Sequence, residues 1–194
     1  MKWPRWLKRT PDGVSEEAAA WRREWTAAIA APDAAALDRL RQSLAAVAAA
    51  MASGNGHPAA ADLETEEEML DALARLVDLH AAIDGGALPR IDTTHRVVGA
   101  DVCHFTAPAS MPDAAAQPSG RLLLTGTRAL FVGGPRLVAL PWHAAAEIVR
   151  TDRDVLIVKH DRTDLLRFRC NTYGDALAAA ILARHLMGAG RRTL

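Results

Sequence analysis

The chain has 194 residues, of which 50% are hydrophobic and 24% charged, and its formal net charge at pH 7 is zero. These proportions are typical of a globular protein and exclude a disordered chain, while the neutral charge removes the whole-chain argument for nucleic acid as a partner. No apolar stretch is long enough to span a membrane, and two cysteines are too few for a disulfide framework. We therefore expect a cytoplasmic protein with reduced thiols.

Residues 1–13 are expected to form an exposed leader that combines tryptophans with basic side chains and ends in a Pro-Asp-Gly turn. Two hypotheses account for Trp3 and Trp6. Tryptophan beside lysine and arginine favours the headgroup layer of an anionic membrane. Alternatively, both rings pack on the helical part of this chain or of a partner. Both hypotheses stay open, although Pro4 and Pro11 limit any membrane-bound helix here.

Residues 14–88 carry the pattern of a helical domain with three helices. The first contains Trp21 and Trp25 on one face. The second, over 33–52, and the third, over 62–84, each carry an apolar stripe at steps of three and four, which predicts an antiparallel hairpin. The stripes are Leu37, Leu40, Leu44, Val47 and Met51 in one helix, and Met69, Leu73, Leu76, His80 and Ile83 in the other. Because each stripe is short, we expect assembly to cover the seam, and we predict a homo-oligomer.

After Pro89 the hydrophobic period changes from helical to alternating, which predicts a second domain of short antiparallel strands over residues 95–187. In the last strand, apolar residues alternate with Arg167 and Arg169, and a final helix is expected from about Thr172. The candidate strands, each bounded by turn residues, are Val97–Ala107, Arg121–Thr125, Arg128–Val132, Arg136–Leu140, Ala146–Thr151, Val155–His160 and Leu165–Cys170.

The order of seven strands followed by one helix resembles the pleckstrin-homology superfold. The segments GRLLLTGTRALFVGG, RLVALPW, EIVRTDRDVLIVKH and LLRFRC are similar to the GRAM-like and bacterial pleckstrin-homology-like pattern. The positions close to that pattern in the second and third strands are Gly120, Leu122, Leu124, Thr125, Arg128, Leu130 and Phe131. We therefore expect an α+β protein: an N-terminal helical hairpin or bundle, then a seven-stranded antiparallel pleckstrin-homology-like barrel capped by a C-terminal helix.

The resemblance implies a binding module rather than an enzyme, because members of this family hold phosphoinositide head groups, protein segments or other domains. Lipid-binding members use Lys and Arg around the loop between the first two strands. Here that loop, from Pro108 to Gly120, contains neither residue type. It lacks the donors that charge-assisted contacts to phosphate need, so we expect recognition of a protein or of another copy of the chain.

Side chains that serve catalysis or metal binding in other proteins are present, but without the necessary spacing. Cys103, His104, His143 and Cys170 include no C-x-x-C or H-x-x-x-H pair, so we predict no metal site and no cofactor. The serines lack a nucleophile elbow, and the glycine-rich turn at 133–135 lacks the context of a phosphate loop. We expect no catalytic residues and no enzymatic activity.

A basic stretch runs over the last three strands and comprises Arg150, Lys159, Arg162, Arg167 and Arg169. One interpretation is a solvated sheet face whose charges prevent aggregation through sheet edges. The other is a face that binds anions or an acidic partner, with weak and salt-sensitive attraction.

Two functional hypotheses follow from these features. The first is a non-enzymatic binding or scaffold protein, whose sheet domain recognises a protein partner or itself and whose helices mediate assembly. The second is a peripheral membrane protein at the inner face of the membrane, which binds anionic lipid through Trp3, Trp6 and the basic sheet face.

Overall fold

The computed structural model describes residues 16–52, 63–133, 137–161 and 165–192. The chain divides into two compact units, residues 1–80 and 81–194. The first unit is helical, and the second combines an antiparallel sheet with a C-terminal helix, so the chain is an α+β protein as predicted. Among the helices that the structure describes, none is long and apolar enough to cross a membrane.

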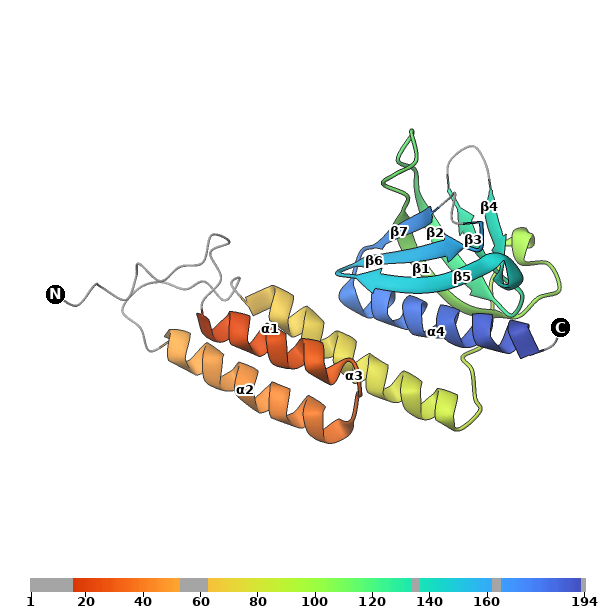
Figure 1. Cartoon of the computed structure of the whole chain (residues 1–194). Helices are drawn as coiled ribbons and strands as arrows, with labels where there is room; N and C mark the ends of the chain where they lie inside the picture. Colours follow the sequence, from red (N-terminus) through yellow and green to blue (C-terminus); the bar gives the residue numbers. More distant parts are fainter. Residues whose placement is uncertain (1–15, 53–62, 134–136, 162–164, 193–194) are drawn as a thin grey trace. The chain divides into compact units, whose positions relative to one another are not determined.

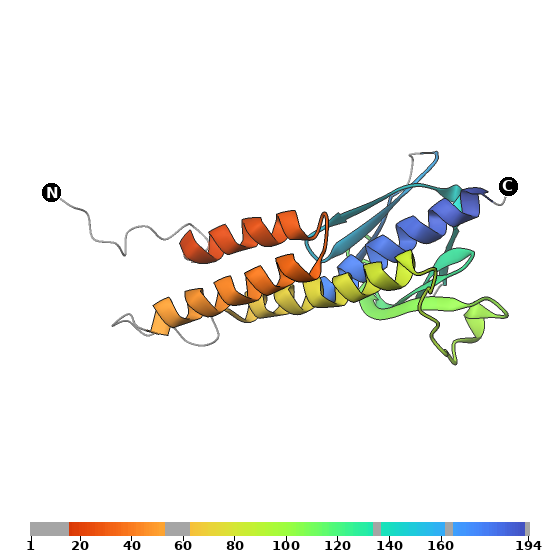
Figure 2. The same ribbon diagram turned by 90° about the horizontal axis from the view of Figure 1, so that it is seen from below.

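The helical unit is built from α1 (Glu16–Ala28), α2 (Ala34–Ala52) and most of α3 (Glu64–Asp84). α1 and α2 run side by side in opposite directions (Figures 1 and 2). The turn between them ends at Asp33, whose carboxylate accepts a hydrogen bond from the Ala36 amide at 2.6 Å. This N-cap satisfies a backbone donor that the helix itself leaves unpaired, and it explains why α2 begins where the sequence predicted.

Side chains of α1 connect it to both other helices of this unit. Trp21 donates its indole N–H to a backbone carbonyl of α2 at 3.0 Å, and Trp25 donates to a backbone carbonyl of α3 at 2.6 Å. Both rings are buried, so each fills the core while its polar atom keeps a partner. Arg22 pairs at 2.6 Å with Glu66 of α3, whose side chain is fully buried. The core of this unit therefore includes α1, which is bonded to both α2 and α3.

The second unit contains seven strands and a closing helix. They are β1 (Cys103–Ser110), β2 (Ser119–Thr125), β3 (Arg128–Val132), β4 (Val138–Pro141), β5 (Ala145–Thr151), β6 (Asp154–Lys159), β7 (Leu165–Cys170) and α4 (Tyr173–Arg192). All neighbouring strands are antiparallel, in the order β4-β3-β2-β1-β7-β6-β5. The predicted first strand began too early, because residues 96–98 form a 3₁₀ turn, η3, and Gly99 follows with φ of +67°. That left-handed backbone interrupts the extended chain, and the strand begins only at Cys103.

The sheet has two halves, β1–β4 and β5–β7, which meet at a short junction. β1 pairs with β7 only through Ala109↔Cys170 and Ser110↔Arg169. α4 contacts strands of both halves, and Figure 1 shows it along the inside of the curved sheet. The core beneath the sheet includes the rings of Phe131 and Phe168, whose centroids are 5.8 Å apart. We call the side toward α4 the inner face and the opposite side the outer face.

The segment before β1 covers the outer face of the first half of the sheet. Val98 packs there with Leu123 of β2 and Leu130 of β3, and Ile91 and Val97 add partly buried contacts. Ile91 also forms an isolated antiparallel bridge to the first residue of β1. This half of the sheet is therefore covered on both faces, which explains why β2 is buried along most of its length.

Candidate functional site

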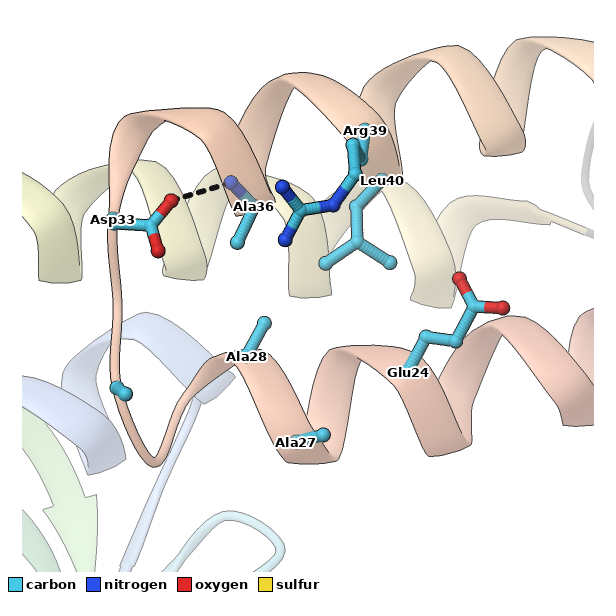
Figure 3. Close-up of a pocket in the computed structure, with 8 residues that line it drawn as sticks. Glu24, Ala27, Ala28, Asp33, Ala36, Arg39 and Leu40 are labelled. Carbon is cyan, nitrogen blue, oxygen red and sulfur yellow. Dashed lines mark hydrogen bonds between the residues drawn. The ribbon is translucent and has the colours of Figure 1, made fainter.

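A cavity of about 380 Å³ lies between the end of α1 and the start of α2. Half of its lining residues are alanine, including Ala27, Ala28 and Ala36, and Figure 3 shows the side chains of Glu24 on α1 and Arg39 on α2 in the space between the two helices. Asp33, the other acidic group, already caps α2. The cavity is a gap left by small side chains, and we assign no ligand to it.

No cluster of three or more His, Cys, Asp or Glu suited to a metal ion occurs within the described ranges. Cys103 and Cys170 are both buried in the sheet unit. Burial raises the pKa of the Cys103 thiol and raises the pKa of Cys170 to about 12, so both thiols are protonated and poor nucleophiles at neutral pH.

The outer face of β5–β7 presents polar and apolar side chains in rows that the strand register defines. The rows are Thr151–Asp154–Arg169, Val149–Leu156–Arg167 and Glu147–Val158–Leu165. We call these nine residues the arginine face. Leu165 is 44% exposed, and the three other apolar members are only partly buried. An apolar strip that solvent reaches therefore lies next to two guanidinium groups on a rigid sheet.

Asp154 holds both guanidinium groups in place. Its Oδ1 accepts a hydrogen bond from Arg169 Nε at 2.9 Å, and its Oδ2 accepts from Arg169 Nη2 at 3.1 Å. Oδ2 also accepts from Arg167 Nε at 2.9 Å and from Arg167 Nη2 at 2.5 Å. The Asp154 side chain is only 6% exposed, whereas those of Arg167 and Arg169 are 30% and 54% exposed. One buried carboxylate thus orients two arginines whose outer edges remain accessible.

The electrostatics of this cluster agree with its geometry. The hydrogen bond from Arg169, followed by that from Arg167, holds the pKa of the Asp154 carboxyl below its usual value despite burial. The hydrogen bond to Asp154 in turn raises the pKa of Arg169. Asp154 is therefore ionised at neutral pH, and the three groups together carry one net positive charge.

A second carboxylate reaches the cluster from the loop between β1 and β2. Asp113 Oδ1 accepts a hydrogen bond from Arg167 Nη1 at 3.3 Å, and the Asp113 side chain is 55% exposed. This contact is longer and far more open to water than those of Asp154, so it is the weaker of the two ion pairs. It occupies one accessible edge of Arg167.

The basic residues that the sequence grouped together are divided between the two faces of the sheet. Arg150 lies opposite Val155, whose side chain is buried on the inner face. Burial lowers the pKa of the Arg150 guanidinium. Lys159 follows Val155 at the two-residue period of that same face. Arg167 and Arg169 lie on the outer face, so of the described members only these two come together. Arg162 lies outside the described residues, as do Trp3 and Trp6.

Sequence reasoning missed the residue on which the arginine face depends. The predicted strand began at Val155, whereas Asp154 is the first residue of β6 and pairs with Arg169 across the ladder. One signal was available in the sequence. A single hairpin separates Asp154 from the two alternating arginines, and a hairpin places opposite charges on neighbouring strands. Asp113, in a loop remote in sequence, gave no such signal.

Comparisons with other proteins leave the family open. No protein-family profile and no curated protein matches the sequence. The structure is similar to the crystal structure of the C-terminal domain of an unknown protein from Leishmania infantum, at 11% sequence identity and a TM-score of 0.41. The similarity covers 47% of this chain and 89% of that one.

Proposed function

We propose that this chain is a non-enzymatic binding protein whose sheet unit docks a protein segment on the arginine face. One observation carries the proposal. The outer face of the first half of the sheet is covered by its own chain, whereas the same side of β5–β7 leaves Leu165 44% exposed beside Arg167 and Arg169. Arginine is enriched in protein interfaces, and the exposed apolar side chains beside it are area that a partner can bury.

The chemistry of the remaining groups supports a binding role over catalysis. The thiols are buried, and their pKa values are raised. The two arginines already share a carboxylate with short hydrogen bonds, an arrangement that positions donors and supplies no nucleophile or base. We also propose that the sheet unit is of the pleckstrin-homology-like type, which the order of seven antiparallel strands followed by one helix supports.

For the helical unit we propose a role in assembly, with another copy of the chain as its partner. Leu40 and Leu44 of the predicted stripe are buried, whereas Leu37 and Val47 on the same helix are only partly buried. A partly covered apolar stripe favours association through helix–helix contact.

The docking proposal is tested by protein capture with matched leucine variants of the full chain. Leu165→Asp places a charge on the arginine face, and Leu137→Asp places the same charge on a leucine that is 48% exposed before β4. We expect a partner that wild type and Leu137→Asp both retain from cell extract to be lost with Leu165→Asp. Retention by all three proteins would refute docking on this face.

Anionic vesicles test the membrane alternative with the same proteins. On the docking proposal, vesicles containing phosphatidylserine do not sediment the chain at low salt. Sedimentation that is lost on Trp3→Ala combined with Trp6→Ala would favour the membrane hypothesis instead.

A further inference from the structure

We propose that the ligand of the arginine face is an acidic protein segment, and that one of its carboxylates takes the position that Asp113 occupies on Arg167. This inference rests on the proposed docking function and specifies the chemistry of the partner. It makes Asp113 an internal competitor, a residue of the chain that partly fills its own binding site.

The geometry leaves donors for such a carboxylate. Asp154 engages Nε and Nη2 of both Arg167 and Arg169, so Nη1 of each guanidinium lies outside this contact. Nη1 of Arg169 has no partner within the described part of the chain, and Nη1 of Arg167 is held only by Asp113 at 3.3 Å. Two arginines fixed by one buried carboxylate lose little side-chain entropy on binding, because their rotamers are already set.

A carboxylate is the group that Arg167 already binds at this position, because Asp113 Oδ1 accepts a hydrogen bond from its Nη1. In this hydrogen-bonded cluster Asp154 and Asp113 balance the charges of the two arginines, while Asp152 acts on Arg169 and Glu147 lies on the same face, so that both add negative charge. A partner carboxylate that takes the place of Asp113 keeps the charge bound to Arg167 unchanged, whereas a phosphate dianion adds a further negative charge. The neighbouring apolar side chains, Leu156, Val158 and Leu165, require the same segment to carry aliphatic residues.

Asp113 is suited to displacement because its contact is weak. Its side chain is 55% exposed, and an exposed ion pair of this kind is screened by water and contributes little to stability. Removing the competing carboxylate is therefore expected to tighten binding of an acidic segment by roughly two- to fivefold.

The experiment is an NMR titration of the ¹⁵N-labelled full chain with a short peptide of alternating aspartate and valine. The arginine Nε–Hε signals of Arg167 and Arg169 report binding directly. We expect these signals to shift with the aspartate peptide and not with its asparagine analogue. We further expect Asp113→Asn to bind two- to fivefold more tightly than wild type, and Arg167→Gln to lose binding while its backbone amide spectrum stays native.

Asp38→Asn is the matched control. It removes the same charge from another exposed aspartate that pairs with arginine, Arg41 at 2.7 Å in α2, and should leave the peptide affinity unchanged. Equal affinities of Asp113→Asn and wild type would overturn the inference, as would equal shifts with inorganic phosphate at the peptide's concentration.

The two proposals fail in different ways. If Leu165→Asp abolishes capture of the partner but Asp113→Asn does not change peptide affinity, docking on the face stands and the role of Asp113 is wrong. If neither capture of the partner nor binding of the peptide depends on the arginine face, both proposals are wrong.

Discussion

Asp154 is the residue on which the arginine face depends, because its carboxylate is almost fully buried and accepts hydrogen bonds from two arginines. A buried charge is costly unless it is paired, and here both oxygens are paired. The arginines in turn keep access to water, so the cluster combines a rigid base with an exposed edge. The Asp154 side chain therefore contributes to the stability of the sheet unit and also orients the two arginines of the proposed binding site.

The pH dependence of the unfolding free energy should show the contribution of the Asp154 carboxylate. Hydrogen bonds from Arg169 and then Arg167 lower the folded pKa of Asp154, so its contribution is fully present above the unfolded pKa of about 4. That contribution is lost as pH falls through the folded pKa. We expect Asp154→Asn to lower the unfolding free energy by about 1–3 kcal/mol at pH 7, with the difference shrinking below about pH 4.

Urea unfolding of wild type and Asp154→Asn at a series of pH values measures this effect. Asp113→Asn is the control, because its carboxylate is 55% exposed and should change stability by no more than about 1 kcal/mol. If the difference in unfolding free energy between wild type and Asp154→Asn stayed constant down to acid pH, the ionised Asp154 carboxylate would not be its source.

At the scale of elements, β2 and β3 approach so closely at one end that only glycine fits. A Cβ added at Gly120 would lie 2.2 Å from the Val132 carbonyl oxygen, and one added at Gly133 would lie 2.6 Å from the Ser119 carbonyl oxygen. Both obstacles are backbone atoms, which cannot rotate away. The two glycines therefore set the spacing of the strands next to the loop that carries Asp113.

We expect Gly120→Ala to destabilise the sheet unit by about 1–3 kcal/mol or more, because the strands must separate to admit the methyl group. Gly188→Ala in α4 is the matched control. No atom outside its own helix lies within 4 Å of the added Cβ, so alanine should stabilise that helix by about 0.5–1 kcal/mol. Thermal and urea unfolding of both variants check the prediction, and equal stabilities would show that the strand contact is more adaptable than its geometry indicates.

At the scale of the whole molecule, charge is distributed unevenly although the total is zero. Residues 1–90 contain 10 Lys and Arg against 14 Asp and Glu, and residues 91–194 contain 13 against 9. A neutral chain has little long-range repulsion between copies, which permits self-association through apolar surface. The partly buried stripe on α2 supplies such a surface.

We expect sedimentation equilibrium of the full chain to give a mass above the 20.8 kDa of the monomer, rising with concentration. Val47→Asp should reduce that mass, because it places a charge in the half-buried stripe. Ala48→Asp, at the next and exposed position of the same helix, should leave the mass unchanged. A strict monomer at high concentration would refute the homo-oligomer.

Hydrophobic period and turn residues were sufficient to predict the α+β class and most element positions. β3 and β7 have the predicted bounds, and α2 begins after the predicted Asp33 cap, because alternation and capping are local properties of a few neighbouring residues. The sequence by itself thus determined the type and order of the main helices and strands, and that Arg167 and Arg169 share a side of β7.

Only the tertiary structure decided what surrounds those two arginines. Their partner Asp154 lies 13 and 15 residues away, and Asp113 lies 54 residues from Arg167, so the cluster exists only when the strand register is set. The same register places Arg150 on the opposite face, and the packing of residues 91–98 leaves β5–β7 as the accessible half of the sheet. The physical reason is that contacts between distant segments decide the strand register and which half of the sheet is covered. The residue type at any single position does not encode these contacts.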